Sequence, residues 1–198
     1  MPTGNPYAAP RANLVQPIIQ QPTFFVVAPR KLVLMVLLSQ GFYAFYWLYK
    51  HWKSYRAATG ARVLPLVRAF FSVFFVYALV MKIKQALNLK DAFYRWWPRC
   101  FALGWITCAF LPFTYIWFVS SLTALKLGLC LAIVQVAMAV QIQHAVNHLE
   151  NDPRGHANSR ITWANGIWIC IGVFLWVFAI SSALGVGTVL LDQWATEH

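Results

Sequence analysis

Five apolar stretches, separated by polar and basic segments, set the pattern of the chain. The first holds 18 uncharged residues, from Leu32 to Tyr49, which is the lower limit for a helix that crosses a bilayer. The others cover residues 63–81, 100–119, 125–146 and 166–191. The last three are long enough to cross, so the pattern predicts an all-α integral membrane protein with three transmembrane helices. The path of the two N-terminal stretches is left open.

Both N-terminal stretches contain a feature that disfavours a simple crossing. Ser39, Gln40 and Gly41 interrupt the first near its middle, and Gly41 offers the chain a place to turn. Arg68 lies inside the second, and the 13 uncharged residues after it (69–81) are too few to span. Two main arrangements follow. Either both stretches form re-entrant hairpins that enter and leave on one face, or all five stretches are transmembrane helices; a mixture, in which one of the two crosses, is the remaining arrangement.

The distribution of basic residues separates these two arrangements, because Lys and Arg collect on the cytoplasmic side. Five crossings would place ten of the sixteen Lys and Arg residues on one side and six on the other. Two hairpins would place fifteen on one side and leave only Lys126 on the other. The hairpins also spare Arg68 a mid-bilayer position that would cost roughly 2.5 kcal/mol or more. The sequence therefore favours the hairpins, with the N-terminus and everything to Arg99 cytoplasmic.

The chain divides into four regions. Residues 1–23 are rich in proline and are expected to form a disordered tail. Residues 24–99 form a membrane-embedded region, residues 100–191 a three-helix transmembrane region, and residues 192–198 a short tail. Within the second region, the basic and aromatic segment 82–99 is expected to be a helix lying in the interface. A positively charged loop is the alternative.

Composition agrees with the membrane class, with 60% hydrophobic and only 11% charged residues. The net charge of +11 is interpreted as topology and attraction to anionic lipid. Nucleic acid is not a predicted partner, because no soluble basic face is long enough. All five acidic residues lie outside the apolar stretches, which counts against a proton- or cation-coupled transporter. The four cysteines fit neither a zinc site nor a disulfide framework.

Three motifs carry a resemblance to a known family. The run from Gly41 to Lys50, GFYAFYWLYK, matches the pattern G-x-Y-x-x-Y-W-x-Y-K. The run PLVRAFF at 65–71 matches P-x-x-R-A-x-F, and residues 158–165 match N-x-R-x-T-x-x-N. Together they resemble a family of small bacterial inner-membrane proteins of unknown function, over most of residues 24–185. The resemblance implies a bacterial inner-membrane location and no established activity.

Arg68 is the first candidate for a functional contact. Its planar guanidinium can bind a lipid phosphate or a partner's carboxylate, or it can snorkel to the interface and fix the depth of the helix. The aromatic residues after Gly41 can line a lipid slot or form an interface belt. The candidate lipid or partner contacts are Arg68, Lys82, Lys84, Arg95, Trp96, Trp97, Arg99, Tyr43, Tyr46 and Trp47, with Gly41 as the hairpin turn.

No catalytic, cofactor or metal site is predicted. His144 and His148 have a spacing that zinc sites use, but no glutamate lies between them as a metallohydrolase would need. The predicted function is a non-enzymatic membrane protein that shapes or scaffolds the membrane. Its basic, aromatic cytoplasmic face would engage anionic lipid headgroups, a protein partner or a second copy of the chain. The alternative is an oligomeric small transporter or channel subunit, with Gln141 and His144 lining the pathway.

Overall fold

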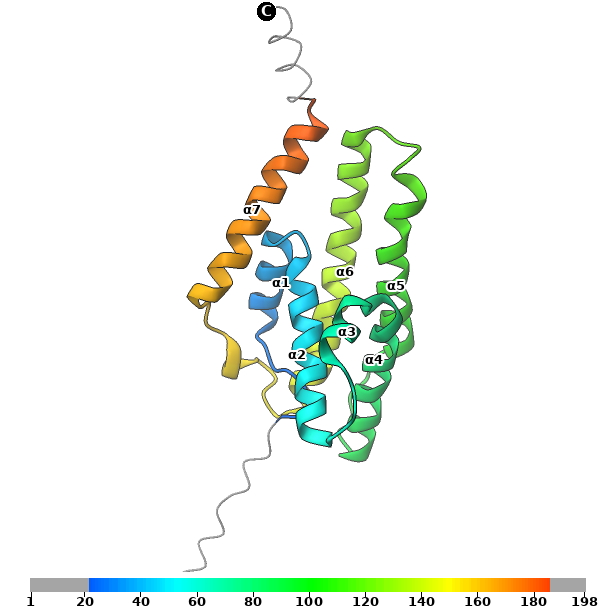
Figure 1. Cartoon of the computed structure of the whole chain (residues 1–198). Coiled ribbons are helices and arrows are strands. Elements are labelled where there is room, and N and C mark those ends of the chain that lie inside the picture. Colours follow the sequence, from blue (N-terminus) through cyan, green and yellow to red (C-terminus); the bar gives the residue numbers. More distant parts are fainter. Residues whose placement is uncertain (1–21, 186–198) are drawn as a thin grey trace, which may run out of the picture.

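The structure, a computed structural model, describes residues 22–185, and all regular secondary structure in that range is helical. The helices are α1 (Pro29–Leu38), α2 (Phe42–Thr59), α3 (Pro65–Phe70), α4 (Ser72–Leu89), α5 (Pro98–Tyr115), α6 (Ser121–Leu149) and α7 (Trp163–Ala183), with a 3-10 turn at His156–Asn158 (Figure 1). The predicted all-α class is confirmed for this part of the chain. Most of the predicted tail 1–23, the end of the last apolar stretch and the tail 192–198 lie outside the described residues.

Three of the described helices are long and apolar enough to cross a membrane, which indicates a membrane location. Two of them, α6 and α7, fall on predicted spans. The third is α4 and not α5, the helix that contains most of the predicted span 100–119. The second apolar stretch was expected to be too short, but its helix continues past Met81 to Leu89 and includes two lysines. Conversely, α5 begins with Pro98 and Arg99 and ends at Tyr115, before the apolar stretch does.

A tight turn at residues 39–41 joins α1 to α2. Gln40 and Gly41 both have positive φ, 51° and 87°, a conformation that glycine adopts at little cost. The Gly41 amide donates to the carbonyl of Val36 at 2.8 Å, which closes the end of α1. The Ser39 hydroxyl accepts from the Tyr43 amide at 2.9 Å and so fixes the start of α2. The two helices therefore run in opposite directions (Figure 1).

The second apolar stretch has a different shape. After α2 the chain returns without helical structure to α3, which is only six residues long. Phe71 interrupts the helix, with φ −89° and ψ 39°, and α4 starts at the next residue. Instead of the expected pair of antiparallel apolar arms, this stretch is a short helix followed by one long helix.

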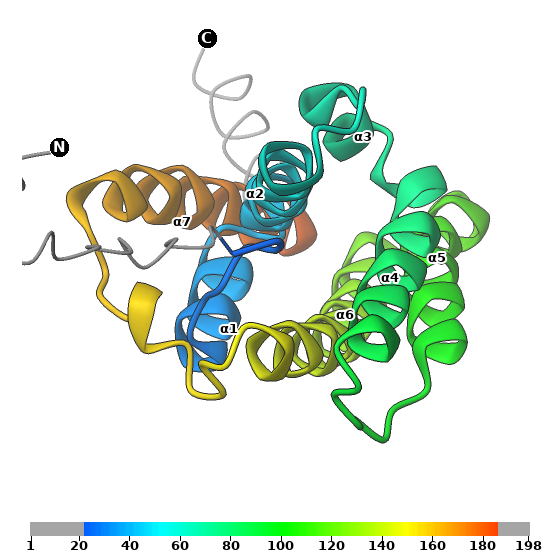
Figure 2. The ribbon, with the colours of Figure 1, turned by 90° about the horizontal axis from the view of Figure 1, so that it is seen from below.

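The turn between α1 and α2 and the junction between α3 and α4 both lie level with the middle of α6. A cavity of about 400 Å³ is lined by Gly41 at the first turn, Ser72 at the start of α4, Ala109 of α5 and Gln135 of α6. Gln135 lies midway along α6, and every buried residue of that helix lies beyond it, from Val136 onward. Past this level only α5, α6 and α7 continue within the described part of the chain (Figure 1). Figure 2 shows α1, α2, α4 and α6 arranged around a common centre in the other half.

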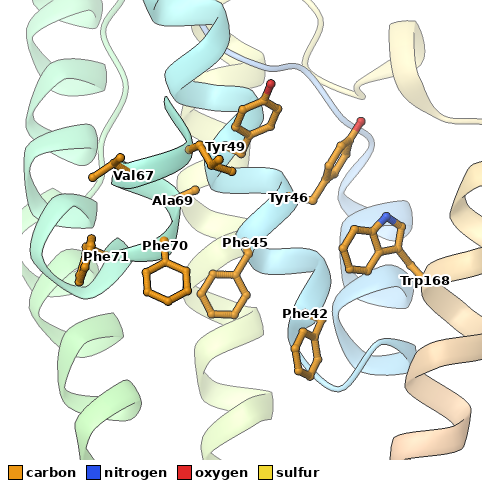
Figure 3. Close-up of a pocket in the computed structure, with 10 residues that line it drawn as sticks. Phe42, Phe45, Tyr46, Tyr49, Val67, Ala69, Phe70, Phe71 and Trp168 are labelled. Atoms are coloured by element: carbon orange, nitrogen blue, oxygen red, sulfur yellow. The ribbon is translucent and has the colours of Figure 1, made fainter. Parts of the chain in front are cut away.

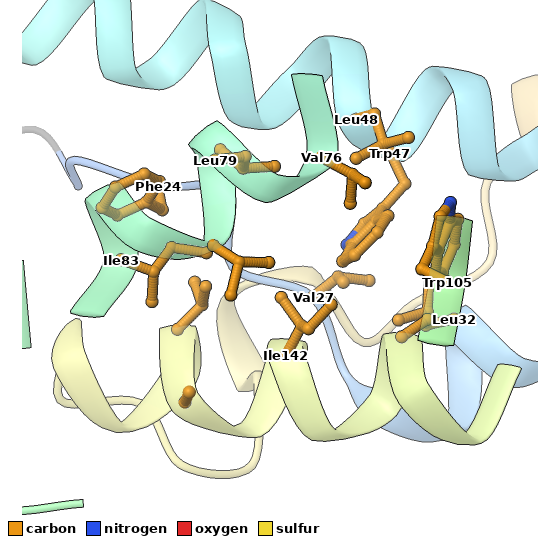
Figure 4. Close-up of a cluster of buried hydrophobic side chains, with 14 of the residues drawn as sticks. Phe24, Val27, Leu32, Trp47, Leu48, Val76, Leu79, Ile83, Trp105 and Ile142 are labelled. Carbon is orange, nitrogen blue, oxygen red and sulfur yellow. The ribbon is translucent and has the colours of Figure 1, made fainter. Parts of the chain in front are cut away.

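Bulky apolar side chains fill that half. Trp47 of α2 lies against Trp105 of α5, with ring centroids 5.8 Å apart, and Figure 4 shows both facing Ile142 of α6. Leu79 and Ile83 of α4 are also fully buried. The core is therefore formed between α1, α2, α4, α5 and α6, and few residues of the apolar windows of α6 and α7 are buried.

A buried extended segment, residues 24–28, crosses this core without helical structure. Side chains supply the hydrogen bonds that its backbone would otherwise lack. Gln143 Nε2 donates to the carbonyl of Phe25 at 3.1 Å, and Asn147 Nδ2 donates to the carbonyl of Val27 at 3.0 Å. The amide of Phe25 donates to His51 Nδ1 at 3.3 Å. The polar second half of α6 is thus used to hold the N-terminal segment in place.

Candidate functional site

Two cations stack on aromatic rings where α2, α3 and α4 meet. The guanidinium carbon of Arg68 lies 4.3 Å from the ring centroid of Trp52 and 5.1 Å from that of Phe75. Lys82 Nζ lies 4.8 Å from the ring centroid of Tyr55 and donates to its hydroxyl at 3.0 Å. The Trp52 and Tyr55 rings are themselves in contact, with centroids 6.0 Å apart. These five residues form one unit, called here the cationic cluster.

The cationic cluster has no internal counter-ion. Within residues 22–185 the single ion pair joins Lys90 to Glu150 at 4.0 Å, so no carboxylate lies within that distance of Arg68 or Lys82. Stacking occupies the faces of the Arg68 guanidinium, and no hydrogen bond from a described residue engages its in-plane N–H groups. Arg68 is only half-buried. An anion that reaches this side chain would therefore find free donors and two uncompensated positive charges.

The other predicted basic contacts are spread along the end of α4, the following loop and the start of α5. Lys84, Arg95, Trp97 and Arg99 are exposed, whereas Trp96 is half-buried against Phe101. The expected interfacial helix over 82–99 does not form as one element, because α4 continues to Leu89 and residues 92–97 have no regular structure. The charged-loop alternative describes residues 90–97 better.

The three predicted aromatic contacts of α2 separate into two groups. Tyr43 and Trp47 are buried in the core, and Trp47 Nε1 donates to Gln143 Oε1 at 2.7 Å. Only Tyr46 is half-exposed, and its ring contacts Trp168 of α7 with centroids 6.4 Å apart. Tyr43 and Trp47 therefore pack the protein interior, and Tyr46 is the member that a ligand can reach.

An apolar groove of about 760 Å³ lies beside α2, between α3 and α7. Its volume is within the range of small-ligand sites. Figure 3 shows Phe45 of α2 facing Phe70 of α3 across it, with Trp168 on the side of α7. The lining residues are Phe42, Phe45, Tyr46, Tyr49, Leu66, Val67, Ala69, Phe70, Phe71 and Trp168. Of these residues, Tyr46 was predicted from sequence, whereas the contribution of α3 and α7 was not, since residues 70 and 168 are too far apart in the chain to be paired by pattern.

A second, more polar cavity of about 500 Å³ lies next to the groove. Lys31, Lys50, Ser54 and Asn165 are among its lining residues. Lys31 is 5% exposed, and its Nζ donates to Asn158 Oδ1 and to the carbonyl of Arg160, both at 2.7 Å. From sequence, Lys31 was expected to contribute only to topology, because nothing in the pattern indicates that the loop after α6 covers it.

Two buried polar groups of α2 have an atom without a partner within the described residues, His51 Nε2 and Trp52 Nε1. Burial lowers the pKa of His51 to about 3. Because His51 Nδ1 accepts from the Phe25 amide, its ring is the neutral tautomer with a proton on Nε2. His51 is therefore a structural acceptor for the extended segment.

The histidine pair of α6 is also accounted for by packing. The ring of His148 lies against Tyr94, with centroids 5.3 Å apart, and His144 is half-buried. Within residues 22–185 no three His, Cys, Asp or Glu side chains gather as metal ligands would.

No protein-family model, curated protein or solved structure matches this chain. The family resemblance suggested by the motifs around Gly41, Arg68 and Asn158 stays a prediction.

Proposed function

We propose that this chain is a non-enzymatic membrane protein whose basic, aromatic face engages anionic lipid headgroups. The observation that supports this most strongly is the cationic cluster, in which Arg68 and Lys82 stack on rings and meet no carboxylate within the described residues. The two cationic side chains are pre-organised for binding an anion, because stacking on the aromatic rings has already restricted their conformations. Phosphate oxygens of a lipid headgroup supply the missing acceptors.

In the topology that fits this proposal, the pair α1 and α2 and the pair α3 and α4 each enter and leave the membrane on the same side. The turn at Gly41 and the start of α4 at Ser72 lie level with Gln135 in the middle of α6. If α6 spans the bilayer, both turns fall inside it, and the elements that carry them leave on the side they entered. This agrees with the charge count, in which Lys126 alone stands apart from the other fifteen basic residues. In this arrangement α5, α6 and α7 cross, whereas α4, although long enough, starts inside the bilayer.

Protein covers part of the first turn, where Ser39 is buried, as backbone in a bilayer requires, whereas Phe71 at the second turn is exposed. Gly172 of α7 packs against the backbone of Leu38 and Ser39. The basic side would be cytoplasmic, with the N-terminus on that side, and the motif resemblance implies a bacterial inner membrane. Short elements inserted into one leaflet would suit a role in shaping or scaffolding the membrane, with a protein partner or a second copy bound to the same basic face.

The transport alternative receives less support. Its pathway was expected along the polar half of α6, but Gln143 and Asn147 there are committed to the backbone of Phe25 and Val27. The side chains of Gln143 and Asn147 are fully buried. A solute pathway at Gln143 and Asn147 would have to displace the extended segment that they hold, whereas Gln141 and His144, the residues expected to line the pathway, are exposed and half-buried.

The proposal is tested with the full chain purified in a neutral detergent. A ligand that binds the folded state raises the melting temperature by mass action. Phosphatidylglycerol should raise the melting temperature more than phosphatidylcholine, and the double variant Arg68→Gln, Lys82→Gln should reduce that difference. The matched control is Lys84→Gln, Arg99→Gln, which removes two exposed charges outside the cationic cluster. A wild type stabilised equally by both lipids would refute anionic-lipid engagement.

A further inference from the structure

The apolar groove and the polar cavity are two parts of one site. They share the side chains of Tyr46 and Trp168, which line both. Figure 3 shows these two rings side by side between α2 and α7. A ligand with one polar and one apolar end could therefore occupy both parts at once, passing the pair of rings.

The polarity of this combined site changes along α2. The apolar groove uses Phe42, Phe45 and Tyr49, which begin at the turn that lies level with the middle of α6. The polar cavity uses Tyr46, Lys50 and Ser54, which share one helix face at intervals of four residues. From Phe42 to Ser54 the helix rises about 18 Å, at 1.5 Å per residue. In the one-sided topology the apolar end therefore points into the bilayer and the polar end toward the basic surface.

The polar cavity contains positive charge without a counter-ion. No described carboxylate lies within 4.0 Å of either Lys31 or Lys50. Neutral oxygens surround the Lys31 ammonium, including Asn165 Oδ1 at 3.2 Å when that amide faces it. A buried ammonium held only by neutral groups is costly and is stabilised by a nearby anion.

Three hydrogen-bond donors in the cavity are unused. The Lys50 ammonium lies over the rings of Phe25 and Tyr46, 5.1 Å and 6.0 Å from their centroids. Within the described part of the chain, no hydrogen bond engages this ammonium, the Tyr46 hydroxyl or the Ser54 hydroxyl. Phosphate oxygens accept from such donors.

We propose that the groove and the polar cavity bind one anionic glycerophospholipid. Its phosphate binds Lys50 and the hydroxyls of Tyr46 and Ser54, near the charge of Lys31, and one acyl chain lies in the groove against Phe45 and Phe70. The site rests on the proposed function, since both require anionic lipid, but it uses none of the residues of the cationic cluster. Acyl chains are the abundant apolar groups at the depth of the groove, and the unneutralised lysines select an anionic headgroup.

The test is native mass spectrometry of the full chain in neutral detergent, titrated separately with phosphatidylglycerol and phosphatidylcholine. The wild type should form a one-to-one adduct with phosphatidylglycerol at a lower lipid concentration than with phosphatidylcholine. Lys50→Gln should weaken this adduct about tenfold, as expected when a charged hydrogen-bond donor is lost. Val67→Trp should weaken it at least as much by filling the groove.

Matched controls separate the site from general effects. Lys53→Gln removes an exposed charge three residues further along α2 that lines neither cavity. Val134→Trp places the same bulky ring on α6, where the valine is 44% exposed like Val67. Both controls should bind phosphatidylglycerol like the wild type, and so should Arg68→Gln.

The outcomes distinguish this site from the proposed function. A preference for phosphatidylglycerol that Lys50→Gln and Val67→Trp leave unchanged would overturn the site and leave the proposed function standing. If Val67→Trp weakens the lipid adduct but Lys50→Gln does not, and the wild type binds phosphatidylglycerol and phosphatidylcholine equally, the proposal that the occupant is anionic would be overturned. A wild type that shows no preference between the two lipids would overturn both this site and the proposed function. A dimer that Val67→Trp dissociates, with no lipid adduct in the wild type, would replace the lipid by a second copy of the chain.

Discussion

Trp176 of α7 donates a hydrogen bond from Nε1 to the carbonyl oxygen of Leu37, at 2.9 Å. Leu37 lies in the last turn of α1, where helix carbonyls have no partner within their own helix. Because Trp176 lies in the second half of α7, this bond ties the turn between α1 and α2 to the interior of a helix that is long and apolar enough to span. The same carbonyl accepts from the Gln40 amide at 3.2 Å, so the indole is a second donor to it at a depth where water is scarce.

The close approach beside this bond predicts a severe effect of a single methyl group. A Cβ at Gly172 would overlap the carbonyl oxygen of Leu38 and the Cα of Ser39, both backbone atoms that cannot rotate away. We expect Gly172→Ala to destabilise the protein by about 1–3 kcal/mol, as overpacking does. The control is Gly166→Ala on the same helix, where the added Cβ meets nothing within 4 Å. Thermal unfolding in detergent measures both, and equal melting temperatures would contradict this packing.

The side-chain amide of Gln143 supports a second prediction. It accepts from Trp47 Nε1 at 2.7 Å and donates to the Phe25 carbonyl and to Asn147 Oδ1. Gln143→Leu leaves these buried groups unpaired, at a cost of about 1–3 kcal/mol each. Gln141→Leu, at an exposed position two residues earlier, should change the melting temperature little. If the two variants unfold alike, the amide does not hold the extended segment.

Part of this arrangement could be predicted from sequence. The polar character of the second half of α6 is visible in the sequence, and two of its polar residues, Gln143 and Asn147, are buried. Their partner, residues 24–28, could not be predicted, because a short apolar run before a proline carries no signal that it is extended and buried. The extent of α4 was misjudged for another reason. Lys82 was taken as the end of the apolar helix, whereas its ammonium bends back to Tyr55 and the helix continues.

The buried imidazole of His51 gives a pH dependence. Burial lowers its pKa to about 3 from the ordinary value of 6.5. Between these two values the unfolded chain binds a proton that the folded chain does not, so stability falls as pH decreases from 6.5 toward 3. His51→Asn, which keeps an acceptor near the Phe25 amide, should flatten the decrease in melting temperature between pH 7 and pH 5. His148→Asn, at an exposed position, is the control, and an unchanged slope in His51→Asn would rule out this origin.

The one-sided topology predicts the labelling of cysteines placed at the ends of the helices. Arg56, Asp91 and Arg154 follow or close α2, α4 and α6, and Figure 1 places these three helix ends at the same end of the bundle. Ser121 starts α6 at the opposite end. All four positions are exposed, so each can react once the natural cysteines are replaced by serine.

With a membrane-impermeant maleimide added to intact cells, only Ser121→Cys should react from outside, because fifteen basic residues hold the other end in the cytoplasm. Permeabilised cells provide the control, in which all four cysteines should react. External labelling at both 56 and 121, but not at 91, would instead establish five crossings. That result would also contradict a turn at Gly41 inside the bilayer, because α2 would then have to leave on the far side, away from the end where Lys90 meets Glu150.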